Sequence, residues 1–326
     1  MKVFLTGGAG YIGSVTSELL LNEGHDVVVF DNLVRGHREA IDPRATFIEG
    51  DLRNADSVSD AMAQVKPDAV MHFAAYALVG ESMVRPEIYF RNNVVGGINL
   101  VESMHANGVK KIVFSSTCAT YGQPENVPIT EDEPQRPQNP YGESKLMFEH
   151  TLKWYQELHG MQPVFLRYFN ACGATAIYGE DHDPETHLIP LVLQVALGQR
   201  ENIKIFGDDY DTPDGTCLRD YIHIVDLARA HIIALEKDVS GPFNLGTGTG
   251  NSVLEVIEAC RDVTGHAIPA ELAPRRPGDP ARLVAGAEKA KSVLGWTPKF
   301  AAIRTIVESA WNWHQAHPNG YESGKG

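Results

Sequence analysis

The chain has 326 residues, 43% of them hydrophobic, which is enough for one large domain or two lobes around a real core. Its 42 acidic and 28 basic residues give a formal net charge of -14, which argues against nucleic acid as a partner because a phosphate backbone would be repelled. We expect no membrane contact, since no run of about twenty apolar residues occurs, and no signal peptide. The four cysteines show neither disulfide nor zinc spacing, which favours a reduced, cytoplasmic protein.

The first 31 residues predict a strand, a glycine-rich turn, a helix and a second strand. Val3–Thr6 is a short apolar run that leads into Gly7–Gly13, which reads G-x-x-G-x-x-G. Ser14–Glu23 has an apolar face at helical spacing, and Val27–Phe30 is a second apolar run that ends at Asp31. This order is typical of a dinucleotide-binding fold, although a glycine turn without a ligand is the alternative.

Each glycine of this motif has a predicted task. Gly7 allows the tight turn, Gly10 lets backbone N–H groups approach a pyrophosphate at the helix N-terminus, and Gly13 lets helix and strand pack closely. Asp31 is placed to accept hydrogen bonds from an adenosine ribose. Its carboxylate favours NAD over NADP, because it would repel a 2′-phosphate, although two arginines follow closely.

The alternation of strands and helices continues beyond the second strand. The predicted elements are Thr46–Ile48, Ala55–Val65, Asp68–Ala74, Ile88–Asn107 and Lys111–Ser115. This rhythm predicts an α/β fold with a doubly wound parallel sheet of the Rossmann type.

Three features of this region bear on the cofactor. Asp51 lies where a strand end could meet an adenine amino group, and capping the following helix is its equally supported alternative role. Ala74 and Ala75 are small enough to leave room for a cofactor against the sheet. Asn92 and Asn93 interrupt a helix, which is costly for two amides unless they form hydrogen bonds.

A helix at 141–159 and a strand at 164–169 follow a surface loop at 124–140 that is rich in proline and acid. Beyond residue 170 the alternation weakens, with predicted helices at 188–197, 253–264 and 288–294. Segments at 221–235 and 243–245 are expected to return to the main sheet. We therefore expect an NAD-binding domain at 1–170, with returning segments near 219–247, and a smaller mixed α/β lobe at 171–326 that binds the substrate.

The candidate catalytic residues follow from position and spacing. Ser115 and Thr117 end a strand on the side where doubly wound sheets bind ligands. Tyr141 and Lys145 are four apart, which puts them on one face of a helix. An ammonium group there would lower the pKa of the phenol from about 10, so that Tyr141 could act as general base and then as general acid. This spacing also occurs on ordinary helix surfaces, but the nucleotide fold around it favours catalysis.

The acid-rich stretch at 180–185 contains His182 and is followed by His187. These side chains could hold a cation, but we interpret the stretch as a solvated loop and expect no metal site. The other histidines show no spacing typical of metal ligands.

In its glycine turn, its acidic residue after the second strand and its Tyr-x-x-x-Lys pair, the chain resembles the extended short-chain dehydrogenase/reductase superfamily. Within that superfamily it more closely resembles the UDP-glucose (UDP-galactose) 4-epimerases. The likeness covers essentially the whole chain. Its marks are GGAGYIG at 7–13, DNL at 31–33, GDLRN at 50–54, HFAA at 72–75, VGES at 79–82, SST at 115–117, YG at 121–122, PYGESK at 140–145, RYFN at 167–170, DGT at 214–216, RDYIH at 219–223 and APRRPGD at 273–279. The later marks are the more specific, because simple dehydrogenases lack them.

The resemblance implies reversible inversion at C4 of a UDP-hexose through a transient 4-keto sugar, within galactose metabolism. Tyr141 would take the proton of the sugar 4-hydroxyl while C4 gives hydride to tightly bound NAD+, and the hydride would return to the other face of the turned sugar. Thr117 and Lys145 would complete the catalytic set. The residues expected to contact NAD are Gly7, Gly10, Tyr11, Ile12, Gly13, Asp31, Asn32, Asp51, Leu52, Phe73, Ala74, Ala75, Asn92, Ser115, Tyr141, Lys145 and Tyr168.

The resemblance also implies a UDP-sugar site. Arg219 and Arg276 would clamp the diphosphate, although surface ion pairing with nearby acids explains both arginines equally well without the resemblance. Asp279 would meet the uridine ribose, and Asn170 the sugar or its phosphate. The remaining expected contacts are Thr117, Tyr141, His187, Leu188, Phe206 and Leu283.

Three positions depart from the family pattern. Thr117 replaces a serine and keeps the hydroxyl, so we expect little change. Ala77 stands where some members have a lysine that reaches the cofactor, which leaves open how tightly NAD is retained on purification. Leu283 stands where some members have a tyrosine, so N-acetylhexosamines could also fit.

The motifs leave one alternative function open and disfavour two others. A related 4-epimerase acting on UDP-GlcNAc/GalNAc or a UDP-pentose is the alternative. A 4,6-dehydratase is disfavoured because Cys118 and Ala119 stand where that enzyme needs an acid pair, and a non-catalytic NAD-binding regulator is disfavoured because the catalytic Tyr and Lys are both present. The helices at 88–107 and 144–158 could pair with their copies in a homodimer, as the family does.

Overall fold

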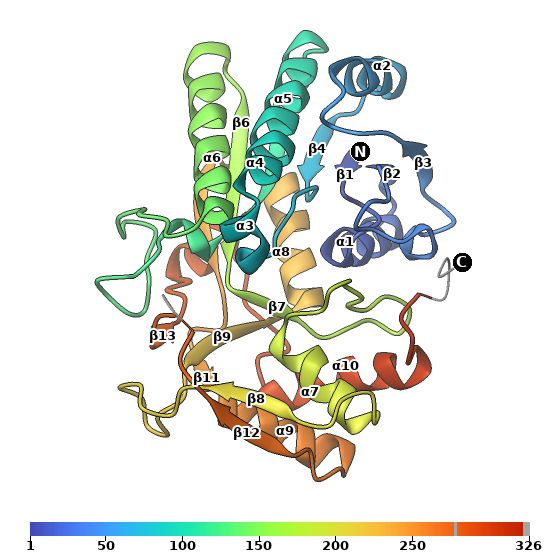
Figure 1. The fold of residues 1–326 in the computed structure, drawn as a ribbon. Helices are drawn as coiled ribbons and strands as arrows, with labels where there is room; N and C mark the ends of the chain where they lie inside the picture. Colours follow the sequence, from blue (N-terminus) through green and yellow to red (C-terminus); the bar gives the residue numbers. More distant parts are fainter. Residues whose placement is uncertain (277–278, 322–326) are drawn as a thin grey trace.

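The computed structural model describes residues 1–276 and 279–321, which form a larger lobe above a smaller one in Figure 1. The larger lobe holds a seven-stranded sheet in the order β10-β6-β5-β4-β1-β2-β3, and every neighbouring pair in it is parallel. Its strands are β1 (Lys2–Thr6), β2 (Asp26–Asp31), β3 (Thr46–Glu49), β4 (Ala69–His72), β5 (Lys111–Thr117), β6 (Gln162–Tyr168) and β10 (Gly241–Leu245). The predicted doubly wound parallel sheet is confirmed.

Helices cover both faces of this sheet because its central strands are apolar on both sides. Val3 and Leu5 pack on the face covered by α1 and α8, whereas Phe4 packs on the face covered by α2, α5 and α6. These helices are α1 (Tyr11–Asn22), α2 (Ala55–Val65), α5 (Gly96–Ala106), α6 (Pro140–His159) and α8 (Ile224–Glu236). Strands buried on both faces read as continuous apolar runs, as they do in the sequence.

The smaller lobe is mixed α/β, as predicted. Strand β9 pairs with β7, β11 and β13 in one sheet, and β8 pairs with β12 in another. Its elements are β7 (Asn170–Cys172), α7 (Leu188–Ala196), β8 (Ile203–Phe206), β9 (Leu218–His223), β11 (Gly250–Ser252), α9 (Val253–Thr264), β12 (Ala270–Ala273), β13 (Arg282–Leu283), a π-helical turn η4 (Ala290–Leu294) and α10 (Ile303–Ala316). Of the segments expected to return to the main sheet, β10 pairs with β6, whereas β9 lies in the smaller sheet.

The helix predicted at 88–107 is built differently. It consists of α4 (Pro86–Tyr89), a π-helical turn η2 (Phe90–Val95) and α5, and Asn93 lies in the widened turn. The Asn93 side chain accepts a hydrogen bond from the Tyr76 N–H at 2.9 Å and donates to the Tyr76 carbonyl at 3.0 Å and the Ser144 hydroxyl at 2.9 Å. The remaining helical elements are α3 (Val79–Val84) and the 3-10 turns η1 (Arg38–Ala40) and η3 (Cys118–Thr120).

The ends of α6 fix where its side chains point. The Asn139 side chain accepts a hydrogen bond from the Gly142 N–H at 2.8 Å, Pro140 stands in the first turn, and Gly160 ends the helix in the left-handed region at φ 63°. These caps hold Tyr141 in the first turn of α6. Within the described ranges, no helix is long and apolar enough to cross a membrane.

Candidate active site

In the glycine turn after β1, neighbouring backbone atoms leave no room for a side chain at Gly7 and Gly13, whereas Gly10 has free space beside it. A Cβ at Gly7 (φ +75°) would lie 2.4 Å from the Ala74 nitrogen, and one at Gly13 would lie 2.2 Å from the Gly7 carbonyl oxygen, so neither fits. A Cβ at Gly10, the N-cap of α1, would meet the Gly7 oxygen at 3.5 Å, an ordinary contact. The fold itself would tolerate a side chain at Gly10, and the space beside this helix N-terminus suits a pyrophosphate.

Asp31 ends β2 beside this turn. Its carboxylate accepts hydrogen bonds from the Ala9 N–H at 3.0 Å and the Leu33 N–H at 2.9 Å, which fastens the turn to the loop after β2. Burial raises the pKa of Asp31, and the backbone hydrogen bonds oppose that rise. The carboxylate therefore lies at the strand end where a ribose contact was predicted.

Asp51 is not a helix cap. The side chain of Asn54 caps α2 by accepting a hydrogen bond from the Ser57 N–H, so the alternative role predicted for Asp51 is wrong. Asp51 instead accepts hydrogen bonds from Arg53 at 2.5 to 3.1 Å and from Asn32 at 3.1 Å. The hydrogen bond from Arg53 lowers the pKa of Asp51 to about 2, so the carboxylate is ionised at neutral pH.

Lys145 is buried at 3% exposure beneath the end of β5. Its Nζ donates a hydrogen bond to the Ser115 carbonyl at 2.8 Å and lies 4.8 Å from the centre of the Phe114 ring. Burial lowers the pKa of Lys145 to about 7. A group with this pKa can change its charge near neutral pH.

Tyr141 lies one turn before Lys145 on α6 and is 9% exposed. Burial raises its pKa and Tyr168 raises it further, whereas a hydrogen bond with Thr117 opposes the rise. The predicted net lowering of this pKa is therefore wrong for the protein's own groups, because desolvation of the phenolate outweighs every nearby dipole and charge. The structure does bring the three predicted catalytic residues together.

The other predicted cofactor contacts surround the same edge of the sheet. The Tyr168 hydroxyl lies 2.9 Å from the Ser115 hydroxyl, and the N–H groups of Phe73 and Ala74 both donate to the end of β1. Tyr11 donates a hydrogen bond to the Gly173 carbonyl at 2.5 Å, which joins α1 to the smaller lobe. Ile12, Leu52, Ala75 and Asn92 lie on α1, after β3, after β4 and in η2, and Asn92 donates a hydrogen bond to its neighbour, Asn93.

A buried ion pair that the sequence pattern did not predict lies one helical turn beyond Lys145. Arg167 on β6 and Glu149 on α6 are 1% and 0% exposed, with Nη2 and Oε2 2.6 Å apart. Ser116 donates to Glu149 at 2.6 Å, and Arg167 donates to the Tyr121 hydroxyl at 2.9 Å. The available signal was the charged residue inside the apolar run VFLRYF.

Strand pairing in the smaller lobe places Arg219, one of the two predicted diphosphate residues, near other predicted substrate contacts. Arg219 donates to the carbonyls of Leu218 and Pro280 at 2.9 Å and forms an ion pair with Asp279 at 3.2 Å. Leu283 lies opposite Arg219 in the register of β13 and β9. Asn170, at the start of the adjacent β7, donates a hydrogen bond to the Asp220 carbonyl at 3.0 Å.

Four further predicted contacts lie at two other places in this lobe. The guanidinium carbon of Arg276 lies 3.9 Å from the centre of the Phe206 ring. His187 is the N-cap residue of α7, and Leu188 is its first residue. Residues 277 and 278 of the predicted APRRPGD motif lie outside the described residues.

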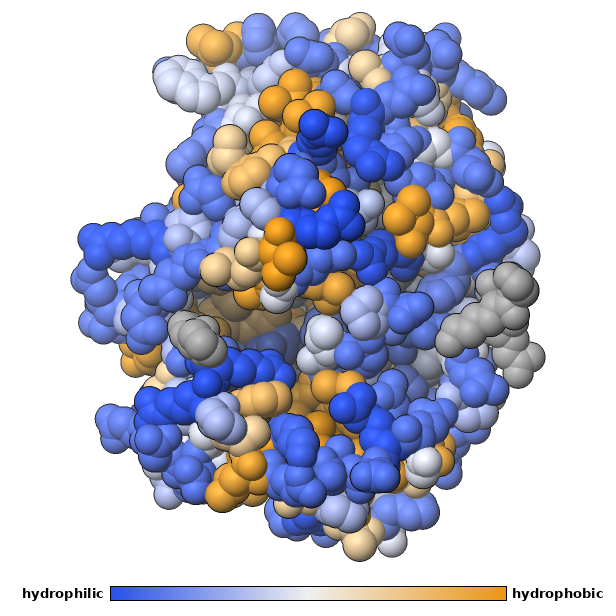
Figure 2. All heavy atoms as spheres, viewed as in Figure 1, coloured by the Kyte–Doolittle hydropathy of each residue, from blue (hydrophilic) through white to orange (hydrophobic). Residues whose placement is uncertain are grey.

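An apolar cluster lies between the end of β5 and β13 of the smaller lobe. Its buried residues are Tyr121, Ile129, Phe169 and Ala285, with Cys118 and Leu283 packed against them. Cys118 directly follows Thr117, so Leu283 and Thr117 border the same cluster. The surface in Figure 2 is hollowed between the two lobes.

The stretch at 180–185 is a loop, as predicted, and Asp183 and Pro184 are exposed, but the loop is not solvated throughout. The side chains of Glu180 and Glu185 are only 5% and 7% exposed, and both contact imidazole rings. Buried carboxylates need a positive charge nearby, and the imidazole rings are the groups in contact with both of them.

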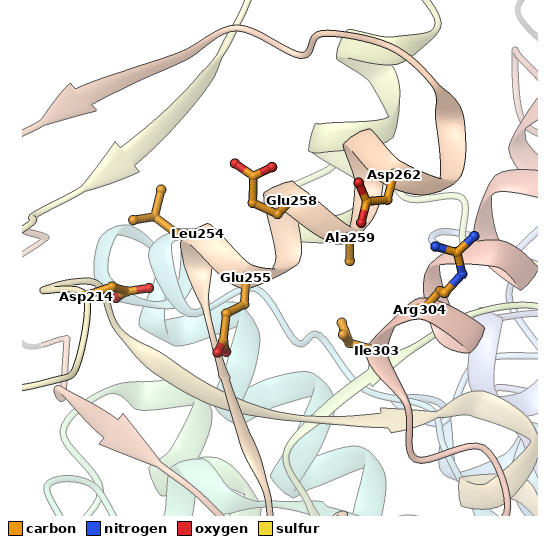
Figure 3. Close-up of a pocket in the computed structure, with 8 residues that line it drawn as sticks. All are labelled: Asp214, Leu254, Glu255, Glu258, Ala259, Asp262, Ile303 and Arg304. Atoms are coloured by element: carbon orange, nitrogen blue, oxygen red, sulfur yellow. The ribbon is translucent and has the colours of Figure 1, made fainter.

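A cavity of about 560 Å³ lies elsewhere, against α9 and the start of α10 (Figure 3). Its lining residues are Asp214, Leu254, Glu255, Glu258, Ala259, Asp262, Ile303 and Arg304. None of the predicted site residues lines it, and its carboxylates would repel a diphosphate. The cavity is therefore separate from the candidate active site.

Comparison with known proteins gives consistent results. Residues 3–246 match the NAD dependent epimerase/dehydratase family. The chain is 56% identical to the UDP-glucose 4-epimerase of Halalkalibacterium halodurans, covering 99% of this chain and 98% of that protein. Its fold is similar to a crystal structure of UDP-glucose 4-epimerase with TM-score 0.97 and 54% identity, covering 99% and 100% of the two chains. It is also similar to the Bifidobacterium longum enzyme in complex with NAD+ and UDP, with TM-score 0.94 and 41% identity over 98% of this chain and 100% of that one.

Proposed function

The chain belongs to the NAD dependent epimerase/dehydratase family, and on that premise we propose that it reversibly inverts C4 of UDP-glucose and UDP-galactose. Relatives at 50 to 56% identity over nearly the whole chain are UDP-glucose 4-epimerases. The observation that carries the proposal is the meeting of Thr117, Tyr141 and Lys145 at the end of β5, on the same sheet edge as the glycine turn.

The residues of the larger lobe fit NAD, the cofactor of this family. Bound NAD supplies the acceptor for the hydride from C4 and its donor in return. The open space at Gly10 suits the pyrophosphate, and Asp31 is available to the adenosine ribose. Asp51 is assigned to the adenine side, and Tyr168 and Lys145 to the nicotinamide side. We assign these contacts to residues 1–170, with α8 and β10 returning near 219–247.

Tyr141 moves the proton in this proposal. Its phenolate accepts the proton of the sugar 4-hydroxyl as hydride leaves C4, and its phenol gives the proton back when hydride returns to the other face. Thr117 holds the sugar hydroxyl in line. Because burial raises the pKa of Tyr141, the phenolate needs nearby positive charge, which Lys145 and the ring of NAD+ supply.

The smaller lobe holds the UDP-sugar. Arg219 and Arg276 clamp the diphosphate, and Asp279 binds the ribose after giving up its ion pair with Arg219. The Phe206 ring offers a flat apolar surface to uracil. The guanidinium group of Arg276 lies over this ring. Asn170, His187, Leu188 and Leu283 complete the lining of the sugar and phosphate site.

The test follows conversion of UDP-galactose to UDP-glucose by NMR without added NAD, with the purified enzyme. We expect equilibrium between the two sugars, and loss of conversion in Tyr141→Phe with the fold and NAD content kept. Conversion of only UDP-GlcNAc or a UDP-pentose would instead identify the alternative epimerase. Retention of activity by Tyr141→Phe would exclude the proposed proton path.

We further propose a cytoplasmic homodimer that pairs α5 and α6 with their copies. On α6, Met147, Trp154 and Leu158 are 39%, 59% and 67% exposed, and their spacing puts them on one face. Light scattering after size exclusion should give twice the chain mass, and Trp154→Glu should give the monomer. Four free cysteines support a reducing compartment, which cell fractionation would check.

A further inference from the structure

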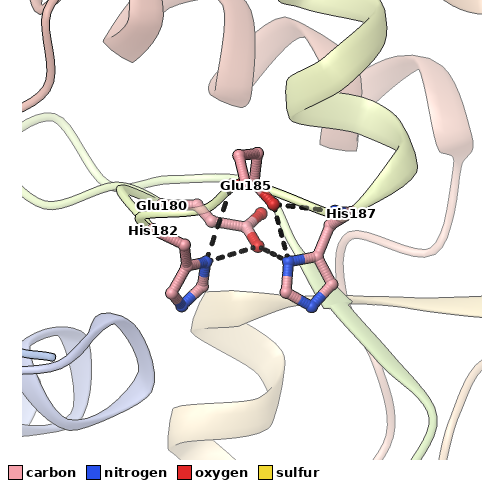
Figure 4. A group of neighbouring side chains, drawn as sticks. All are labelled: Glu180, His182, Glu185 and His187. Atoms are coloured by element: carbon pink, nitrogen blue, oxygen red, sulfur yellow. Dashed lines mark hydrogen bonds and ion pairs between the residues drawn. The ribbon is translucent and has the colours of Figure 1, made fainter. Parts of the chain in front are cut away.

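The loop between β7 and α7 holds four side chains with metal-ligating atoms. This Glu–His cluster consists of Glu180, His182, Glu185 and His187, and Figure 4 shows both imidazole rings turned toward the carboxylates. One ligand atom from each side chain lies within 4.8 Å of the others. His187 is a proposed substrate contact, whereas the other three have no role in the proposed reaction.

The two carboxylates of the cluster are buried and need a positive partner. The side chains of Glu180 and Glu185 are 5% and 7% exposed, and ionised carboxylates at this depth must be neutralised. Within residues 1–276 and 279–321, no lysine or arginine forms an ion pair with either of them. The neutralising charge therefore comes from the imidazoles or from a bound cation.

The spacing of the four atoms matches a tetrahedral metal site. His187 Nδ1 lies 2.9 Å from an oxygen of each carboxylate, and His182 Nδ1 lies 3.3 Å and 3.6 Å from them. Nitrogen and oxygen ligands at about 2.0–2.1 Å from a tetrahedral zinc ion are about 3.3 Å apart. The observed distances bracket this value, so an ion fits after small movements of the side chains.

The Nδ1 atom of His182 distinguishes a metal from a pair of imidazolium ions. It is buried and makes no hydrogen bond, so in an imidazolium its proton would be left without an acceptor of good geometry. A neutral imidazole can give the same atom to a metal.

We propose that the Glu–His cluster binds one divalent transition-metal ion, with zinc the best match, as a structural site that fixes the start of α7. Two imidazoles and two carboxylates suit zinc better than magnesium or calcium, which prefer oxygen ligands alone. Glu185 already accepts a hydrogen bond at 2.7 Å from the N–H of His187, the N-cap residue of α7. The proposal does not depend on the reaction assigned to the protein.

The test uses the full chain, purified without a metal-affinity tag and treated with a chelator. Zinc is added, and its content and affinity are measured by elemental analysis and by competition with a chromophoric chelator. We expect one zinc ion per chain, and at least about 10-fold to 100-fold weaker binding in His182→Gln and in Glu180→Gln. Circular dichroism of each variant shows whether it has folded.

A matched control uses the second group of His and carboxylate side chains, Glu23, His25 and Glu236. His25→Gln should bind zinc as the unaltered chain does. Zinc should also raise the unfolding temperature of the unaltered chain but not that of His182→Gln, and binding should release protons.

Two results would overturn the proposal. One is equal zinc binding by the unaltered chain and His182→Gln, or binding that is lost in His25→Gln instead. The other is an NMR spectrum in which His182 Nδ1 stays protonated at neutral pH with zinc present, which would identify a network of imidazolium and carboxylate groups.

Discussion

Two regions of the proposed site differ in how their charged side chains are held. The catalytic edge is the end of β5 with the start of α6, where Thr117, Tyr141 and Lys145 lie, and the substrate edge is the region of β9 and β13 around Arg219. Lys145 is 3% exposed and hydrogen-bonded to a backbone carbonyl, with the Arg167–Glu149 pair fully buried below it. On the substrate edge, the Arg219 and Asp279 side chains are 13% and 34% exposed and paired with each other.

This difference follows from what each edge must do. Proton transfer needs groups fixed within hydrogen-bond reach, and the side chains proposed for it are held by a sheet and a helix whose contacts do not have to change on binding. Binding needs groups that can leave one partner for another, and the Arg219–Asp279 pair is open enough to do so. The predictions below test this distinction.

The largest effect is expected for Tyr141→Phe, which removes the proton-carrying hydroxyl from the catalytic edge. We expect kcat to fall by about 10²–10⁴-fold, with the KM for UDP-glucose and the unfolding temperature nearly unchanged. Steady-state kinetics and thermal unfolding measure both. If KM instead rose as much as kcat was expected to fall, Tyr141 would act mainly in binding the substrate.

Breaking the buried pair should cost stability rather than binding. Glu149→Gln leaves Arg167 buried without its counter-charge, and we expect a loss of about 3–5 kcal/mol in the free energy of unfolding. Glu125→Gln is the matched control, because the Glu125–Arg136 pair is 58% and 71% exposed and should contribute less than about 1 kcal/mol. If urea unfolding gave similar losses of stability for the two variants, the contrast between the buried and the exposed ion pair would be contradicted.

Arg219→Lys tests the substrate edge. Lysine cannot reproduce the planar set of donors, so we expect binding to weaken by about 1.5–3 kcal/mol. This loss should appear as a raised KM for UDP-glucose with kcat nearly unchanged. A fall in kcat alone would show that the guanidinium group acts in the chemical step.

The depressed pKa of Lys145 predicts a pH dependence of stability. The folded chain releases this proton at about pH 7, whereas the unfolded chain keeps it to about pH 10.4. The unfolded state therefore binds more protons between these values, and this group makes stability rise with pH there by at most about 1.4 kcal/mol per pH unit.

Urea unfolding of the cofactor-free chain at pH 7, 8 and 9, compared with Lys145→Met, isolates this contribution. The stability advantage of the methionine variant should shrink as the pH rises. If the difference in unfolding free energy between the two proteins did not change with pH, burial would not lower the pKa of Lys145.

The smallest effect is expected for Leu283→Tyr. The larger ring should narrow the sugar site and lower the turnover of UDP-GlcNAc by roughly 10-fold. The activation free energy for turnover of UDP-glucose should change by only about 0.5 kcal/mol. A panel of UDP-sugars measures the ratio. If the unaltered enzyme does not turn over UDP-GlcNAc, the proposed role of Leu283 is removed.

The sequence by itself determined the features that depend on local spacing. The strand, glycine turn and helix at the N-terminus, the shared helix face of Tyr141 and Lys145, and the exact bounds of α2 and α9 all follow from periodicity and turn chemistry over a few residues. The doubly wound sheet followed from repeating that pattern.

Only the tertiary structure decided which distant residues meet. It put β9 in the smaller sheet, joined Asn93 to Tyr76 and Ser144, and buried the carboxylates of Glu149 and Glu180. It also raised the pKa of Tyr141 against the local expectation. These outcomes depend on burial and on partners far away in the chain, and desolvation is set by the whole surrounding volume, which no short stretch of sequence records.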